Sequence, residues 1–284
     1  MGLYTPNAST LLYGGPGGGK TALAVSSFWD WRAKKLIANG KIITFGAEDN
    51  PALKIPEECR HTAKGTSLRL TSPLLDDQEF IKQFDLIMRK FVYDAQQGNP
   101  LDVLVIDGLS ELDLLFEATY KQETGEAESK FAKWEALLST MFATMMRANH
   151  HTLNCQVIVT ARVMEKKKAK QQGKLTIAGD PGFMDFDYYP SLRGQFRVHL
   201  PHYYNLVLYV ETVTARTKAG KVIPAHAVHM LRTGDFYVKS TWEHEWIAAD
   251  LPDKLLNPMW PGLWAKLTGA METEAKMDEG EVTE

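Results

Sequence analysis

The sequence contains little cysteine and no cysteine or histidine pattern at metal-ligand spacing. Cys59 and Cys155 are the 2 cysteines among 284 residues, and neither lies at ligand spacing from another cysteine. A disulfide-stapled framework and a cysteine-based zinc site are therefore excluded, and we expect reduced thiols in a cytoplasmic protein. Histidine pairs such as His226 and His229 also lack accompanying cysteines or acids, so we expect them to be structural or surface residues.

Long apolar runs and a strong excess of one charge are also missing. No run approaches the roughly 18 apolar residues of a membrane-spanning helix, and no secretory signal precedes residue 14, so we expect neither membrane insertion nor secretion. The formal net charge is −3, so any affinity for nucleic acid requires a local basic segment. Hydrophobic residues still make up 44% of the chain, enough for one elaborated α/β domain or two small ones.

What the chain does contain is a glycine-rich segment that ends in Lys-Thr. Its spacing is G-x-x-x-x-G-K-T, formed by Gly14, Gly15, Pro16, Gly17, Gly18, Gly19, Lys20 and Thr21. An apolar run precedes it and a helix-like segment, 22–31, follows it, which is the strand–loop–helix setting of a P-loop. A flexible glycine-rich turn is the alternative, but the register of the Lys and Thr argues against it.

Each part of this motif has a chemical role. Glycines let backbone N–H groups wrap a polyphosphate, and the helix N-terminus adds partial positive charge. In this pattern Lys20 reaches the β- and γ-phosphates, and the Thr21 hydroxyl holds Mg²⁺. We therefore predict a site for ATP and Mg²⁺ that extends from Gly14 to Ala22.

Strand and helix patterns alternate along the first part of the chain. We expect strands over 41–47, 67–70, 101–106 and 156–160, and helices over 77–96 and about 111–149. This alternation predicts an α/β fold with a mostly parallel sheet flanked by helices.

The character of the chain changes after residue 162. Residues 163–190 are longer than an ordinary connection, and β-like patterns follow over 205–213, 225–231 and 236–239. We expect a core over 1–245, including a β-rich extension from about 198, and then a C-terminal packing segment over 246–271. The tail over 272–284 holds six acids against Lys276 alone, which predicts disorder.

A second nucleotide motif ends at Asp107. The apolar strand Val103-Leu104-Val105-Ile106 precedes this acid, which would orient Mg²⁺ through its water shell. A buried strand ending in Asp is common by itself, but the upstream P-loop favours the functional interpretation. AAA+ machines carry a water-polarising Glu at the next position, where this chain has Gly108.

A catalytic base must then come from elsewhere, and Glu48 is the candidate. It follows the expected strand over 41–47, and the carboxyl ends of parallel strands open onto one crevice. The alternative is that Glu48 only caps a turn with Asp49 and Asn50.

At these residues the chain resembles the RecA-like ATPases. Their catalytic Glu ends the strand after the P-loop helix, and residues 45–49 look like that segment. It is most similar to compact phage-encoded AAA-domain nucleotide-binding proteins related to RecA-core recombinases and single-strand annealing proteins. The resemblance covers most of 8–245, and the matching segments are 11–23, 103–112, 134–138, 157–162 and 190–194.

This resemblance implies a RecA-like P-loop core and further site residues. Thr160 or Arg162 would sense the γ-phosphate at the end of the strand over 157–160. Lys239, with Arg232 in reserve, would reach the nucleotide of a neighbouring subunit, so a ring or filament is expected. The family often has an Arg beyond that Lys, where this chain has Thr241 and Trp242, and a solvated strand-end lysine is the alternative.

A lysine cluster follows the expected sensor strand. It comprises Lys166, Lys167, Lys168, Lys170 and Lys174. RecA-like proteins bind single strands through the loop at this position, and lysines there would neutralise phosphates while the later aromatics, Tyr188 and Tyr189 among them, stack on bases. The alternative is an ordinary solvated charge run ahead of an aromatic cluster.

Together these observations favour an ATPase that couples nucleotide binding to single-stranded DNA in phage recombination or annealing, located in the host cytoplasm if phage-encoded. Other phage replication or recombination proteins are possible partners. A ring helicase-type DNA motor and a nucleotide-dependent assembly or switch ATPase without a DNA role remain alternatives. A small-molecule kinase is less favoured, because no Arg-rich lid is evident.

Overall fold

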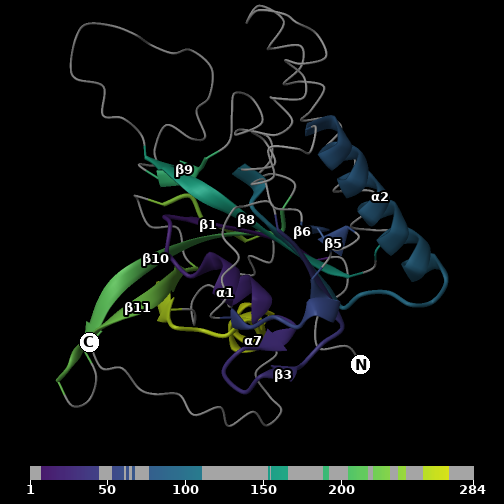
Figure 1. Cartoon of the computed structure of the whole chain (residues 1–284). Helices are drawn as coiled ribbons and strands as arrows, with labels where there is room; N and C mark the ends of the chain where they lie inside the picture. Colours follow the sequence, from purple (N-terminus) through teal and green to yellow (C-terminus); the bar gives the residue numbers. More distant parts are fainter. Residues whose placement is uncertain are drawn as a thin grey trace, which may run out of the picture.

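The computed structural model describes residues 8–44, 53–60, 62–63, 66–67, 77–110, 153, 155–165, 188–191, 204–216, 220–230, 236–240 and 252–268. Nine of the strands in these ranges belong to one mixed sheet (Figure 1). The expected helix over 111–149 lies outside the described residues.

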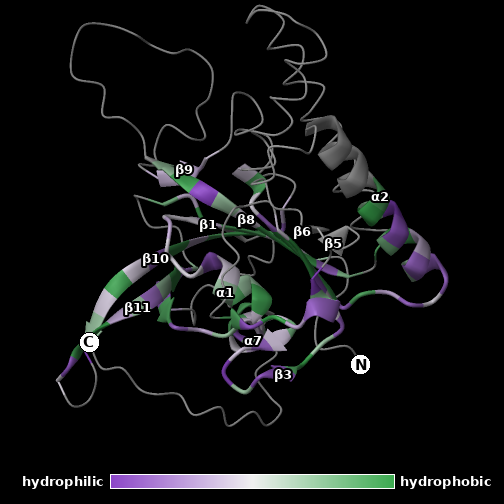
Figure 2. Cartoon of the chain, in the orientation of Figure 1, coloured by the Kyte–Doolittle hydropathy of each residue, from purple (hydrophilic) through white to green (hydrophobic). Residues whose placement is uncertain are grey.

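The centre of this sheet is parallel. Its spatial order is β10-β1-β8-β7-β4, in which every neighbouring pair is parallel. The strands are β1 (Ser9–Gly14), β4 (Gly40–Thr44), β7 (Val103–Asp107), β8 (Gln156–Glu165) and β10 (Leu206–Arg216). Both faces of β1 and of most of β7 are buried, and β7 is a nearly continuous apolar run, as expected of a strand that is covered on both sides. Figure 2 shows the centre of the sheet coloured mainly as hydrophobic.

An antiparallel region continues the sheet beyond β10. There β11 (Val222–His229) pairs with β10, and β13 (Lys254–Leu256) pairs with β11. The short β12 (Lys239–Ser240) pairs with the first residues of β10, and β9 (Tyr188–Pro190) pairs with the end of β8. Figure 1 shows β10 and β11 extending together beyond the rest of the sheet.

This topology refines the expected division between a core and a β-rich extension. The first half of β10 is buried and pairs in parallel with β1, so the strand-rich C-terminal region shares one sheet with the strands of the core. A buried strand has the same apolar pattern in either direction, so the pattern alone could not assign it to the parallel sheet.

Helices cover the sheet, and two short strand pairs form separate two-stranded sheets. The helices are α1 (Lys20–Val25), α2 (Asp77–Gln96), α7 (Trp260–Thr268) and the 3₁₀ turn η2 (Glu57–Cys59). The short pairs are β2 (Trp29–Asp30) with β3 (Lys35–Leu36), and β5 (Thr62–Ala63) with β6 (Thr66–Ser67). In Figure 1, α1 and α7 lie together beneath the sheet, and α2 lies near β5 and β6.

The helix predicted over 22–31 is wrong in its length. α1 ends at Val25, and β2 begins at Trp29. The hydroxyls of Ser26 and Ser27 donate to the carbonyls of Leu23 and Ala24, at 2.7 and 2.6 Å. Serines that bond nearby carbonyls compete with the helical ladder, so this pair ends the helix.

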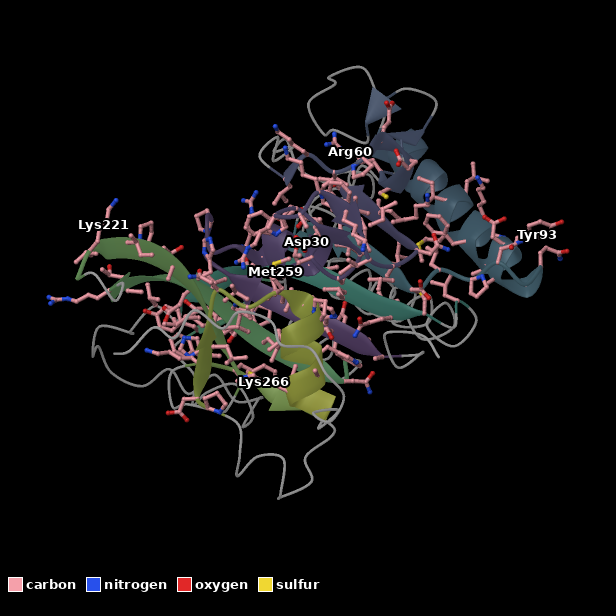
Figure 3. The ribbon with its side chains drawn as sticks, turned by 90° about the horizontal axis from the view of Figure 1, so that it is seen from below. Asp30, Arg60, Tyr93, Lys221, Met259 and Lys266 are labelled. Carbon is pink, nitrogen blue, oxygen red and sulfur yellow. The ribbon has the colours of Figure 1, made fainter. Side chains whose placement is uncertain are left out.

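α7 packs against α1 and the amino end of β8. The Trp260 backbone N–H donates to Ser26 Oγ at 2.7 Å, and its indole N–H donates to Gln156 Oε1 at 2.9 Å. Trp260 and Trp264 are buried with their rings stacked, 6.1 Å between centroids. Figure 3 shows this helix with Met259 labelled just before its start and Lys266 labelled in its last turn. The two tryptophans therefore pack against the core, as expected for part of the C-terminal packing segment over 246–271.

Several other expectations are settled by the described residues. The helix over 77–96 is confirmed, and Ile87, Met88 and Phe91 bury its inner face. The strand predicted over 156–160 continues to Glu165, so its last residues had been wrongly assigned to the following loop. No helix in the described ranges has the length and apolarity needed to cross a bilayer.

Candidate nucleotide-binding site

The glycine-rich loop leaves the carboxyl end of β1, between β10 and β8. A Cβ atom on Gly14 would lie 1.9 Å from the Val210 carbonyl oxygen of β10, so the neighbouring backbone leaves no room for a side chain. Gly17 and Gly19 have φ angles of 72° and 89°, in the left-handed region that favours glycine. The loop therefore needs glycine at these positions for close approach and for backbone conformation.

The loop closes on itself and holds the lysine amine inside it. The Gly18 N–H donates to the Gly15 carbonyl at 3.2 Å. Lys20 Nζ donates to the carbonyls of Gly14 and Gly15, at 3.0 and 2.8 Å. The Lys20 ammonium has three N–H donors, and at this position it can exchange its carbonyl partners for phosphate oxygens.

Asp107 is held between two threonine hydroxyls. Thr21 Oγ1 donates to its Oδ2 at 2.9 Å, and Thr160 Oγ1 donates to its Oδ1 at 2.5 Å. β8 lies between β1 and β7, so the middle of β8 places Thr160 beside Asp107, its partner in the strand register. The structure thus brings together Thr21 and Asp107, the two residues that the sequence assigned to the metal.

Gly108 explains why no second acid follows Asp107. Its φ of 114° lies in the region that favours glycine, and its N–H donates to Thr160 Oγ1 at 3.1 Å. A glutamate at this position would be strained. This backbone conformation therefore disfavours a second acid directly after Asp107, and the position of a catalytic base stays a prediction.

Glu48, the predicted base, lies outside the described residues. The last residue of β4, Thr44, is paired with Asp107, so the chain leaves β4 at the same edge of the sheet as the P-loop. The predicted role of Glu48 is neither supported nor contradicted by a contact.

The donors beside the loop suit magnesium. A threonine hydroxyl and an aspartate carboxylate are hard oxygen ligands, which Mg²⁺ prefers together with phosphate oxygens and water. Within the described ranges, no group of three or more His, Cys, Asp and Glu residues gathers to hold a metal by protein ligands alone. The chemistry of Thr21 and Asp107 therefore fits an ion that is shared with a bound phosphate.

Arg162 lies at the same edge, next to the start of the loop. It is exposed, and its register partner on β1 is Gly14. Its N–H donates to Ser110 Oγ at 3.0 Å, and its carbonyl accepts from the Ser191 N–H at 2.7 Å. Of the two sensor candidates, Arg162 borders the loop and Thr160 contacts Asp107 directly.

The remaining predicted residues are farther away or not described. Lys239 pairs with Val207 of β10, three positions before Val210 at the loop, so its backbone lies roughly 10 Å back along the strand. Its side chain is outside the described part, as are the lysines at 166, 167, 168, 170 and 174. Tyr188, one of the aromatics expected to stack on bases, stacks on Phe236 and Tyr209 within the protein, and its predicted contact with bases stays untested.

Two residues that contact the loop, His226 and Thr212, were not predicted. A Cβ on Gly19 would lie 2.7 Å from the His226 ring, so this histidine on β11 packs directly against the loop's last glycine. Its sequence pattern gave no functional signal, because the contact depends on how β11 pairs with β10. Thr212 of β10 also reaches the loop, where its hydroxyl donates to the Gly17 carbonyl at 3.1 Å.

The sheet order, the loop and the bridged aspartate define a P-loop nucleoside-triphosphate-binding domain. A family model described as an AAA domain matches residues 6–235, and the chain belongs to this AAA-domain family. A search of curated proteins finds no significant match. The family is one of nucleotide-binding ATPase domains, which is the class that the site geometry also indicates.

Proposed function

We propose that this protein binds Mg²⁺–ATP at the loop from Gly14 to Ala22 and hydrolyses it. The observation that carries the proposal is the Asp107 carboxylate, held at 2.9 Å by Thr21 and at 2.5 Å by Thr160. Such a carboxylate beside a P-loop threonine is the arrangement that positions a metal against triphosphate oxygens.

Each residue then has a defined task. Lys20 exchanges its bonds to loop carbonyls for the phosphates, and Thr21 with Asp107 holds the metal side. When bound, the magnesium ion neutralises charge on the β- and γ-phosphates. Glu48 acts as the base that orients the attacking water, a role that rests on its position after β4.

Equilibrium binding of ATP with and without Mg²⁺ tests this assignment. Lys20→Ala should abolish detectable binding, whereas Asp107→Asn should remove the magnesium dependence and leave weak, metal-independent binding. Lys221→Ala, which changes an exposed lysine at the far end of the β10–β11 hairpin, is the matched control (Figure 3). Unchanged affinity in Lys20→Ala would remove the proposed site.

We further propose that nucleotide binding is coupled to single-stranded DNA, in recombination or annealing of a phage. The supporting observation is that β8 carries Thr160 at the nucleotide site and continues to Glu165, directly before the lysines at 166, 167 and 168. A shift of Thr160 on metal binding would therefore pass along one strand to the lysine segment. From the resemblance to RecA-like ATPases, we also propose that Lys239 contacts the nucleotide of a neighbouring subunit in a ring or filament.

Retention of single-stranded DNA at low salt tests the coupling. Replacing Lys166, Lys167 and Lys168 with Ala should abolish retention and any stimulation of ATP turnover by DNA. A matched variant replaces three exposed lysines elsewhere, Lys35, Lys90 and Lys221, and so removes equal charge. Equal loss in both variants would indicate bulk charge only, and unwinding of a forked duplex would favour a DNA motor.

A further inference from the structure

The β10–β11 hairpin contacts the P-loop through two side chains that lie opposite each other. Thr212 of β10 is the register partner of His226 of β11, and partners across an antiparallel pair share one face of the sheet. The Thr212 hydroxyl donates to the Gly17 carbonyl at 3.1 Å. The His226 ring packs against Gly19, where an added Cβ atom would lie 2.7 Å from it. Both side chains therefore reach the loop from the same face of the hairpin, beside α1 in Figure 1.

Asn257 fixes the position of His226 from the opposite edge of β11. The His226 N–H donates to Asn257 Oδ1 at 2.8 Å, and the His226 carbonyl accepts from the Asn257 N–H at 2.6 Å. Because these two backbone bonds point away from β10, Thr212 and His226 form a non-hydrogen-bonded pair, in which the side chains of two strands lie closest. Asn257 directly follows β13, which pairs with β11. The His226 backbone is thus held between two neighbouring segments.

The P-loop has few contacts of its own that would persist when a triphosphate binds. A glycine-rich backbone loses much conformational freedom when it becomes ordered. The Lys20 ammonium donates to the carbonyls of Gly14 and Gly15, but these are the bonds that it exchanges for phosphate oxygens. The hairpin contacts differ, because they use the Gly17 carbonyl and one side of Gly19, and leave the backbone N–H groups to the ligand. They can therefore hold the loop both before and after binding.

The two glycines that the hairpin contacts are also the two with the most unusual backbone conformations in the loop. Gly17 and Gly19 have φ angles of 72° and 89°. The His226 ring acts on Gly19 by its shape, since its buried Nδ1 has no hydrogen-bond partner among the described residues. A flat ring of another kind should therefore serve as well as the imidazole.

We propose that Thr212 and His226 are positioning residues for triphosphate binding, which hold Gly17 and Gly19 in the conformation that receives the phosphates. A loop that is ordered in advance loses less conformational entropy on binding, and so binds more tightly. The effect acts on the phosphate chain and is independent of the base attached to it. This inference rests on the proposed nucleotide site and adds that residues of the hairpin, outside the motif, set its affinity.

The test compares binding of ATP and of inorganic tripolyphosphate, each with Mg²⁺, to the full chain. His226→Ala removes the ring and should weaken binding of both ligands by the same factor, about tenfold, which corresponds to the entropy of fixing one residue's backbone. His226→Phe keeps a flat ring against Gly19 and should bind both ligands within about twofold of the wild type. Thr212→Val removes one exposed hydrogen bond and should weaken binding about threefold.

His229→Ala is the matched control that separates positioning from stability. His229 is buried on the opposite face of β11, where its ring lies against Tyr209 and Phe236 and contacts Glu211. Its replacement should lower the unfolding temperature at least as much as His226→Ala does, and leave both affinities unchanged. The proposal is overturned, with the nucleotide site left standing, if His226→Ala binds as tightly as the wild type or if His229→Ala weakens binding equally.

Hydrogen exchange of the backbone amides over 14–22 in the ligand-free chain tests the loop without any ligand. Exchange should be faster in His226→Ala than in the wild type, and should return to the wild-type rate in His226→Phe. Faster exchange in His226→Ala, in a chain that binds neither ATP nor tripolyphosphate, would support the positioning role and overturn the nucleotide site. Unchanged exchange in His226→Ala overturns the positioning role whether or not ATP binds.

Discussion

Replacing Thr160 with valine tests whether the hydrogen bonds that Thr160 makes at Asp107 stabilise the folded protein. The Thr160 side chain is only 2% exposed, donates to Asp107 at 2.5 Å and accepts from the Gly108 N–H at 3.1 Å. Valine has nearly the same shape, so the substitution removes both hydrogen bonds without opening a cavity. A bond to a charged group contributes about 1.5–3 kcal/mol and a neutral one about 1 kcal/mol. We therefore expect the free energy of unfolding to fall by about 3 kcal/mol.

Urea unfolding followed by tryptophan fluorescence measures this loss. With a slope near 3 kcal/mol/M for a chain of this size, the midpoint should fall by about 1 M. Thr160→Ser, which keeps the hydroxyl, should recover most of it. Thr212→Val serves as the matched control, because this exposed hydroxyl makes one bond to Gly17 and should contribute less than about 1 kcal/mol. If Thr160→Val loses no more than Thr212→Val, the Asp107 bridge does not stabilise the protein.

Three further predictions follow from the described contacts and from the proposed catalytic base, Glu48. Gly14→Ala places a Cβ 1.9 Å from the Val210 carbonyl and should lower stability by about 3 kcal/mol in thermal unfolding, whereas Gly15→Ala, with open space, should be nearly neutral. Glu48→Gln should reduce ATP turnover by about 100-fold or more in a phosphate-release assay, with nucleotide affinity retained; full turnover would refute the base role. Burial raises the pKa of Cys155 to about 12 from an ordinary 9.0, so its thiol should resist alkylation at pH 8 until denaturant is added. Folding raises the pKa of the Cys155 thiol, so the free energy of unfolding should be unaffected by this thiol below about pH 9 and should fall as the pH rises toward 12. Urea unfolding at a series of pH values measures this fall.

Motif residues and long periodic elements could be predicted from the sequence. The strand ending at Asp107 and the helix over 77–96 follow from apolar runs and periodicity that act locally. The pairing of Thr21 with Asp107 was also implied, because the two motifs have a fixed relation in P-loop proteins. What these predictions share is that each depends on residues close together in the chain or on a motif of known geometry.

Features set by distant partners could not be predicted. The residue after α1, Ser26, has such a partner, because its hydroxyl accepts the backbone N–H of Trp260, 234 residues away, while it donates to the nearby Leu23 carbonyl. His226 has no local signal, since its place beside Gly19 depends on the β10–β11 pairing and on Asn257. Propensity and spacing contain no information on which strand will pack against a loop.

The contacts of the loop indicate that two separate demands fix its glycines. Gly17 and Gly19 adopt positive φ angles, the conformation that a backbone usually needs in order to wrap around a phosphate. Gly14 instead meets the Val210 carbonyl of β10, and Gly19 also meets the His226 ring of β11, so the hairpin behind the loop leaves no room for side chains at these two positions. A one-residue slip of β10 against β1 would replace every one of these contacts at once. The register of the hairpin therefore shapes the triphosphate site as directly as the motif residues themselves do.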